Sequence, residues 1–211
     1  MASQAQRTPV GSDVILTLPN NVTIRRYRPT DAPSLSHHGN SKKIWDNLRN
    51  RMPHPYAESD ATFWIQHSQS PAMQAPSDLY GTIPTQYCIS INGEACGSIG
   101  LDFGDPADIY ARTAEVGYWL GVQHWCKGVM GIAVPAFVEW TWRTFTAVLM
   151  RLNAEVSEAN VGSRKVLEKA GFVVEGRRRR AFIKNGVVGD SVFLGMLRPG
   201  VEAEDGESKD S

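Results

Sequence analysis

The longest regular pattern of apolar residues in the chain spans residues 129–144. Apolar side chains recur there three and four positions apart, the spacing of a helix with one buried face. They are Val129, Ile132, Ala133, Ala136, Phe137 and Trp140. This pattern predicts a long helix packed against a sheet. Polar residues able to cap a first turn predict further helices at 31–38, 60–67 and 160–170, with a short one inside 41–55.

Short apolar and β-branched runs separate these helices. They predict strands at residues 22–27, 87–91, 95–101, 114–120, 149–156, 182–184 and 187–197. Asn92-Gly93 and Asn185-Gly186 each lie between two such runs. Asn-Gly is the strongest short signal for a β-hairpin, because both turn residues need positive φ. The alternation predicts an α/β (α+β) domain with a mixed sheet covered by helices.

The ends of the chain differ from its middle. Residues 1–19 are polar and interrupted by Pro and Gly, and residues 199–211 are mostly acidic. Both segments predict flexible tails, the second of them acidic. A chain of 211 residues with 42% hydrophobic residues suits one globular domain, expected at residues 20–198.

Charge and cysteine content narrow the range of partners. The 22 basic and 22 acidic residues cancel, so neither nucleic acid nor an anionic membrane is expected as a partner. Three cysteines without a C-x-x-C pair indicate reduced thiols and a cytoplasmic protein. No signal peptide and no membrane-length apolar run are visible. The five histidines show no metal-ligand spacing, so no metal is expected.

The most informative segment is 114–131, in which a predicted strand leads through a short loop into the long helix. The first N–H groups of a helix have no internal partner and lie at the positive end of its dipole. Gly128 and Gly131 allow close approach of a ligand, and Lys127 adds a positive charge. The segment therefore suits a pyrophosphate, although a tight turn without a ligand has the same pattern.

A second helix start lies at Asn160-x-x-Ser163. Ser163 shares a helix face with Val166, Leu167 and Ala170, which predicts that its hydroxyl points toward the sheet. Asn160 is either a plain N-cap or a ligand contact, and Ser163 is either functional or a solvated first-turn residue.

Three segments together resemble the GNAT superfamily of N-acetyltransferases, most closely its RimJ/RimL-like subgroup. AEVGYWL with HWCKGVMGIAV resembles the family's fourth strand and pyrophosphate loop, and NVGSRKVLEKAGFVVEGRRR resembles the segment that follows its fifth strand. VTIRRYRPTDA resembles the subgroup's first strand. The sequence departs from the family at Met130, where a Gly or Ala is usual. The resemblance implies a mixed, mostly antiparallel seven-stranded sheet with splayed parallel central strands, flanked by about four helices.

The resemblance also implies the cofactor and its contacts. Acetyl-CoA would insert its pantetheine arm between strands 114–120 and 149–156, and its pyrophosphate would bind to the loop. The residues expected to bind coenzyme A are Leu120, Val122, Lys127, Gly128, Val129, Met130, Gly131, Asn160 and Ser163. The acetyl acceptor would be the primary amine of a small molecule or of a peptide, and the protein a monomer or a homodimer.

Two catalytic residues are predicted. Glu115 is the candidate general base, acting through water, and its alternative role is a structural carboxylate paired with an arginine. Ser163 is the candidate acid for the departing thiolate, while Tyr118 is expected in the core. The run Arg177–Arg180 is either a solvated face or a strand with two side chains in the acceptor cleft. The alternative function is a catalytically silent acyl-CoA-binding module.

Overall fold

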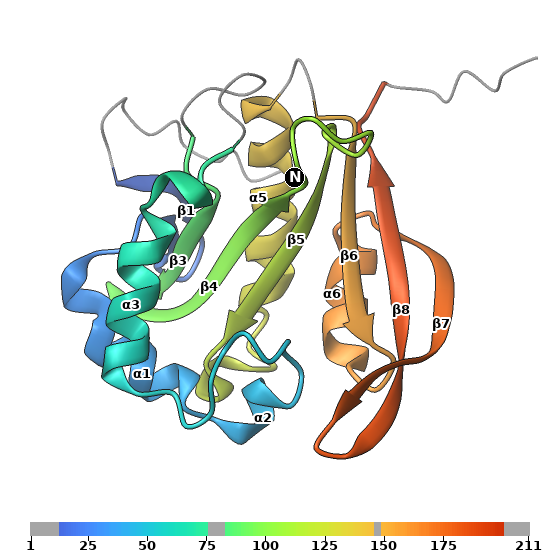
Figure 1. Ribbon diagram of the computed structural model, residues 1–211. Helices are drawn as coiled ribbons and strands as arrows, with labels where there is room; N and C mark the ends of the chain where they lie inside the picture. The colour runs from blue at the N-terminus through green and yellow to red at the C-terminus, as the bar shows by residue number, and fades with distance from the viewer. Residues whose placement is uncertain (1–12, 76–82, 146–148, 201–211) are drawn as a thin grey trace, which may run out of the picture.

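The computed structural model describes residues 13–75, 83–145 and 149–200 of the chain (Figure 1). Eight strands form one mixed sheet in the order β1-β2-β3-β4-β5-β6-β8-β7, and only β5 and β6 are parallel neighbours. The strands are β1 (Val14–Leu18), β2 (Val22–Arg25), β3 (Gln86–Ile91), β4 (Glu94–Phe103), β5 (Thr113–Leu120), β6 (Arg151–Ser157), β7 (Val173–Lys184) and β8 (Val187–Leu197).

Helices cover both faces of the sheet. α1 and α3 pack together on one face, and α5 with α6 covers the other (Figure 1). Five α-helices are described, where about four were expected: α1 (Ala32–Gly39), α2 (Lys42–Trp45), α3 (Glu58–Ser68), α5 (Val129–Thr144) and α6 (Val161–Lys169). Short 3-10 turns lie at Pro29–Asp31 (η1), Pro71–Met73 (η2) and Val122–His124 (η3).

The buried face of α5 forms the centre of the larger core. Ala133, Val134 and Phe137 are completely buried, as the helical spacing predicts. The ring of Phe137 stacks on Trp140 at a centroid distance of 5.3 Å and meets Tyr87 of β3 edge-on at 6.0 Å. A buried phenylalanine of this kind stabilises the fold by roughly 1.5–3 kcal/mol. This packing fixes the start of α5 relative to the sheet.

The sheet has eight strands, so the prediction of seven was wrong. The additional strand is β1, which pairs antiparallel with β2 and lies in the predicted N-terminal tail. Leu16 of β1 is buried in the main core, and Asn20 and Asn21 form the connecting turn with φ of 59° and 55°. Burial of this apolar side of β1 explains why residues 14–18 are ordered in the sheet. Residues 1–12 and 201–211 of the two predicted tails lie outside the described residues.

Both Asn-Gly hairpins are confirmed. Asn92 and Gly93 have φ of 51° and 87°, and Asn185 and Gly186 have φ of 54° and 75°. These values match the type I′ turn that joins two adjacent antiparallel strands. The second turn places the tip of the β7–β8 hairpin opposite the segment that follows α2.

Candidate functional site

The two central strands separate soon after they meet. Parallel pairing of β5 with β6 extends over three residue pairs and ends where Glu115 lies opposite Asn153. Beyond that point β5 stays paired with β4 as far as Leu120, and β6 stays paired with β8 as far as Ser157. The facing edges of β5 and β6 therefore diverge, as Figure 1 shows. The expected splay is confirmed, and the two edges offer backbone groups to an extended ligand.

The loop between β5 and α5 presents the start of α5 toward this gap. The indole N–H of Trp125 donates to the carbonyl of Leu120 at 2.7 Å, which ties the loop back to β5. Cys126 and Gly128 both have positive φ, at 58° and 78°. Gly128 is the N-cap of α5, and no side chain caps this 16-residue helix. Its first N–H groups thus lack helical acceptors, which is the arrangement that binds anions.

The residues around this helix start are arranged to leave it open. A Cβ atom added at Gly128 would meet no atom within 4 Å, so glycine is needed there for its left-handed backbone rather than for space inside the protein. The side chain of Met130 is half-buried and packs against the main core. The ammonium of Lys169 lies 3.5 Å from where a Cβ on Gly131 would be. Lys127 is exposed, and two lysines therefore accompany the helix dipole.

The start of α6 lies across the gap from β5. Asn160 is the N-cap, and its Oδ1 accepts a hydrogen bond from the N–H of Ser163 at 3.1 Å. The hydroxyls of Ser163 and Tyr118 share a hydrogen bond of 2.8 Å, and Tyr118 also contacts the Ser163 carbonyl at 3.2 Å. The predicted inward orientation of Ser163 is therefore confirmed. Tyr118 packs on the core as expected, and its hydroxyl in addition links β5 to α6.

The Tyr118 hydroxyl is held as a neutral donor. Burial raises the pKa of Tyr118 to about 12, although the hydrogen bond to Ser163 lowers it. A phenol with this pKa keeps its proton at neutral pH. Ser163 and Tyr118 thus form a connected pair of hydroxyls beside the separating strands, able to donate to an anionic sulfur.

Glu115 lies at the point where the strands part, on the face opposite to α5. Its Oε1 accepts a hydrogen bond from Nη2 of Arg49 at 2.6 Å, and its side chain is 35% exposed. Arg49 belongs to the segment between α2 and α3. The contact matches the alternative of an arginine-paired carboxylate, and the exposed position still allows contact with water. The structure leaves both roles of Glu115 open.

A second carboxylate, which the sequence analysis missed, lies beside Glu115. Glu155 of β6 lies within the diverging part of the strand and is 3.9 Å from Arg49. Ser191 of β8 donates to its Oε1, and Arg178 of β7 lies 3.4 Å from its Oε2. The signal in the sequence was the period of two from Asn153 to Glu155, which places both side chains on one face.

The tip of the β7–β8 hairpin holds the segment after α2 in place. Nζ of Lys184 donates to the carbonyl of Leu48 at 3.0 Å and to Asn50 at 2.7 Å, and it lies 3.4 Å from the ring centre of Trp45. Asn185 donates to Asp46 at 2.7 Å. These contacts connect the C-terminal side of the gap with the segment that carries Arg49.

Arg177 and Arg178 of the run 177–180 form ion pairs with different carboxylates. Arg177 pairs with Asp190 and Glu158, at 2.6 Å and 2.9 Å, on an exposed part of the sheet. Arg178 alone reaches Glu155, and its guanidinium lies 4.8 Å from the ring centre of Phe193. One of the four arginines thus lines the acceptor side, beside Glu155.

A pocket of about 280 Å³ lies on the same face as Glu115. It is lined by Arg49, Asp102, Phe103, Gly104, Tyr110, Thr113, Glu115 and Asn153. Two carboxylates and one arginine on its wall suit a polar or cationic group. The face opposite to α5 therefore provides a place for an acceptor next to the gap.

The site combines three features: the separation of β5 and β6, the uncapped start of α5 at Gly128, and the nearby carboxylate of Glu115. Together they can hold an acyl-thioester beside an amine. The model of the acetyltransferase (GNAT) domain matches residues 21–173. The chain belongs to this family.

Individual relatives agree with the family. The chain is 41% identical over 88 residues to a probable N-acetyltransferase, YjcK, of Bacillus subtilis, covering 42% of this chain and 48% of that protein. It is 30% identical over 113 residues to a putative ribosomal N-acetyltransferase, YdaF, of the same organism, covering 54% and 59%. The matches therefore span about half of the length of these relatives.

The fold has close counterparts among solved structures. Mycobacterium smegmatis RimJ in complex with CoA-disulfide superposes with a TM-score of 0.67 at 20% sequence identity, over 83% of this chain and 81% of that one. At this identity the likeness concerns the fold alone. Among the described residues, no helix is long and apolar enough to cross a membrane.

Proposed function

We propose that the protein is an acetyl-CoA-dependent N-acetyltransferase that acts on a primary amine. The observation that carries the proposal is the gap between β5 and β6, with the uncapped start of α5 at its end. Donor and acceptor would bind together, from opposite faces of the sheet, and the amine would attack directly. Family membership supports this reading over a silent acyl-CoA-binding module.

The cofactor-binding residues fit coenzyme A. Backbone groups of Leu120 and Val122 would meet the pantetheine arm, and the N–H groups from Lys127 through Gly128, Val129 and Met130 to Gly131 would hold the pyrophosphate. Asn160 would contact the arm from α6. The half-buried side chain of Met130 packs against the core, so we expect it to leave these N–H groups accessible. When bound, acetyl-CoA supplies the activated acetyl group.

The catalytic roles are divided between the two faces. An ammonium with a pKa of about 8 to 10 must lose a proton before it attacks. Glu115 accepts that proton through a water molecule, and Arg49 orients its carboxylate. Ser163, linked to Tyr118, donates to the departing thiolate. Donation from two hydroxyls lowers the charge that builds up on the sulfur.

The acceptor is proposed to be a cationic amine of a small molecule or of a protein N-terminus. Glu115 and Glu155 provide negative charge next to the gap, and the Nη2 atom of Arg49 lies 2.6 Å from one carboxylate and 3.9 Å from the other. The similarity to a putative ribosomal N-acetyltransferase favours the RimJ/RimL-like subgroup and a peptide acceptor. All three cysteines are free, which fits the cytoplasm.

Thiol release with a panel of amines tests the proposal. The purified protein is mixed with acetyl-CoA and with α-amino peptides, polyamines or small amines in turn, and free thiol is measured. We expect release that depends on one class of amine and is lost in Glu115→Gln. Glu139→Gln is the matched control, because Glu139 is an exposed carboxylate of α5 that pairs with Arg143 and lies outside the proposed site.

Ligand stabilisation separates the remaining outcomes. A ligand that binds only the folded state raises the melting temperature. Stabilisation by CoA without turnover of any amine would favour a silent binding module. Stabilisation by ATP or NAD but not by CoA would overturn the proposal.

A further inference from the structure

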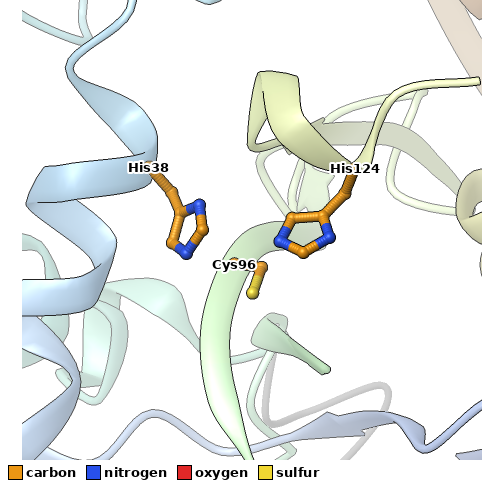
Figure 2. Close-up of side chains that lie close together, drawn as sticks. All are labelled: His38, Cys96 and His124. Carbon is orange, nitrogen blue, oxygen red and sulfur yellow. The ribbon is translucent and has the colours of Figure 1, made fainter. Parts of the chain in front are cut away.

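Three side chains with metal-binding atoms lie together beside the loop that leads into α5, on the side away from the gap between β5 and β6. They are His38 at the end of α1, Cys96 on β4 and His124 in η3 (Figure 2). One ligand atom of each lies within 4.8 Å of the others, and the two imidazole rings are 5.3 Å apart. Figure 2 shows the rings on either side of Cys96, each with a nitrogen facing the space between them. These residues are far apart in the sequence, so no local motif predicts that they lie together.

His38 supplies the strongest evidence that this cluster binds a ligand. Its side chain is 3% exposed, and its Nε2 lies 2.9 Å from Oε1 of Glu94. Its Nδ1 is buried and has no hydrogen-bond partner among the described residues. A buried polar atom without a partner destabilises the fold unless a ligand satisfies it. Because the carboxylate of Glu94 can only accept, Nε2 carries the proton, and Nδ1 presents a free lone pair.

We propose that His38, Cys96 and His124 bind one Zn²⁺ ion. Two imidazoles and a thiolate are ligands that zinc prefers. The bond from His38 to Glu94 reproduces the carboxylate–histidine–metal arrangement, in which the second ring nitrogen is fixed by a carboxylate. Three protein ligands leave the fourth tetrahedral position to a water molecule. This site is separate from the residues proposed for acetyl transfer.

The geometry requires only a small contraction. Zinc bonds of about 2.0–2.3 Å place neighbouring tetrahedral ligand atoms roughly 3.3–3.8 Å apart. The present spread of up to 4.8 Å therefore has to close by about an ångström. His38 and Cys96 lie in the packed interior, whereas His124 lies in a half-buried turn. We expect His124 to make most of this movement.

The thiol of Cys96 donates a hydrogen bond to the carbonyl of Glu94. Zinc binding must displace this proton, which leaves as H⁺ and yields the coordinating thiolate.

A bound ion would connect three parts of the molecule. α1 belongs to the face opposite to α5, β4 to the centre of the sheet, and His124 lies three residues before Lys127 of the proposed pyrophosphate loop. Zinc would therefore anchor this loop to the sheet from the side away from the gap.

Metal titration of the full chain tests the proposal. Protein freed of metal by a chelator is titrated with Zn²⁺ in competition with a chromophoric chelator, and one equivalent is expected to bind. In a parallel experiment, Co²⁺ is expected to give a thiolate-to-metal charge-transfer band and tetrahedral visible bands. Because the Co²⁺ measurement uses the unmodified protein, it does not depend on whether any variant folds.

Variants locate the ion. His124→Ala, in a half-exposed turn, should fold and weaken zinc binding by more than tenfold, and Cys96→Ala should also abolish the charge-transfer band. Glu94→Gln should weaken binding by about 10- to 100-fold. His37→Ala and Cys126→Ser are controls, because both residues are exposed and lie outside the cluster. Absence of stoichiometric binding, or binding lost in Cys126→Ser but kept in His124→Ala, would overturn the proposal.

Discussion

The cofactor side and the acceptor side of the gap are built in different ways. On the cofactor side, backbone groups of one continuous segment, 114–131, and the start of α6 provide the contacts. On the acceptor side, charged side chains meet from four separate places: Arg49, Glu115, Glu155 and Arg178. The first depends on local conformation and the second on long-range packing. Substitutions on the two sides should therefore affect different kinetic constants.

Glu115→Gln should have the largest effect. Removal of a general base reduces the rate by about 100-fold or more, and CoA affinity should stay unchanged because Glu115 lies on the acceptor face. Steady-state kinetics and a CoA binding titration measure the two quantities. Arg49→Ala distinguishes the alternatives: a similar loss in both variants assigns the effect to the ion pair, whereas full activity of Glu115→Gln would exclude the base.

Gly128→Ala should act on the cofactor side alone. Gly128 has a φ of 78°, and a side chain in the left-handed region costs about 1–2 kcal/mol. The loop would relax and move its N–H groups, so CoA affinity should fall by about 5- to 30-fold, because 1.4 kcal/mol corresponds to a factor of ten. Gly128→Asn is the matched control, since asparagine tolerates this conformation. Equal CoA affinity in the alanine variant would contradict the proposed loop.

Ser163→Ala and Tyr118→Phe should each reduce kcat by several-fold. Either hydroxyl can donate in place of the other, so the single losses are small and the double variant should lose more than their product. Measurement of kcat in all four combinations forms a double-mutant cycle. Independent, multiplicative effects would show that the two hydroxyls do not act as a pair.

The smallest effect concerns stability at alkaline pH. The pKa of Tyr118 is about 12 in the folded protein and about 10 in an unfolded chain. A raised folded pKa gives stability that is complete below pH 10 and is lost as the pH rises toward 12. Tyr118→Phe should therefore lose less stability than the parent between pH 8 and 10.5, by somewhat under about 1 kcal/mol. Denaturant unfolding at the two pH values measures the difference, and identical losses would contradict it.

The sequence predicted the features that depend on neighbours along the chain. The helix at 129–144, both Asn-Gly turns and the Asn160 cap are confirmed. The separation of the two central strands, which the family resemblance implied, is confirmed as well. Strand β1 was missed because its apolar run, Val14–Leu18, was included in the polar N-terminal tail. Pairing with β2 and burial of Leu16 in the core order this run in the sheet.

The features that depend on distant residues could not be predicted. The position of Glu155 in the candidate site depends on contacts with Arg49, Arg178 and Ser191, which come from three other parts of the chain. The grouping of His38, Cys96 and His124 likewise arises from the packing of α1, β4 and η3. Histidine spacing along the chain excludes only local motifs, and the expectation of no metal rested on that spacing alone.

Among the described residues, the seam between two parts of one sheet consists of three residue pairs between β5 and β6 and the hydrogen bond from the Met150 N–H to the Arg112 carbonyl. On one side β1 to β5 form a continuous antiparallel ladder, and on the other β6, β7 and β8 form a second one. Each ladder is thus a candidate cooperative unit for local unfolding. Amide hydrogen exchange should then show different protection in the two ladders. A ligand that contacts both β5 and β6 should reduce this difference in protection.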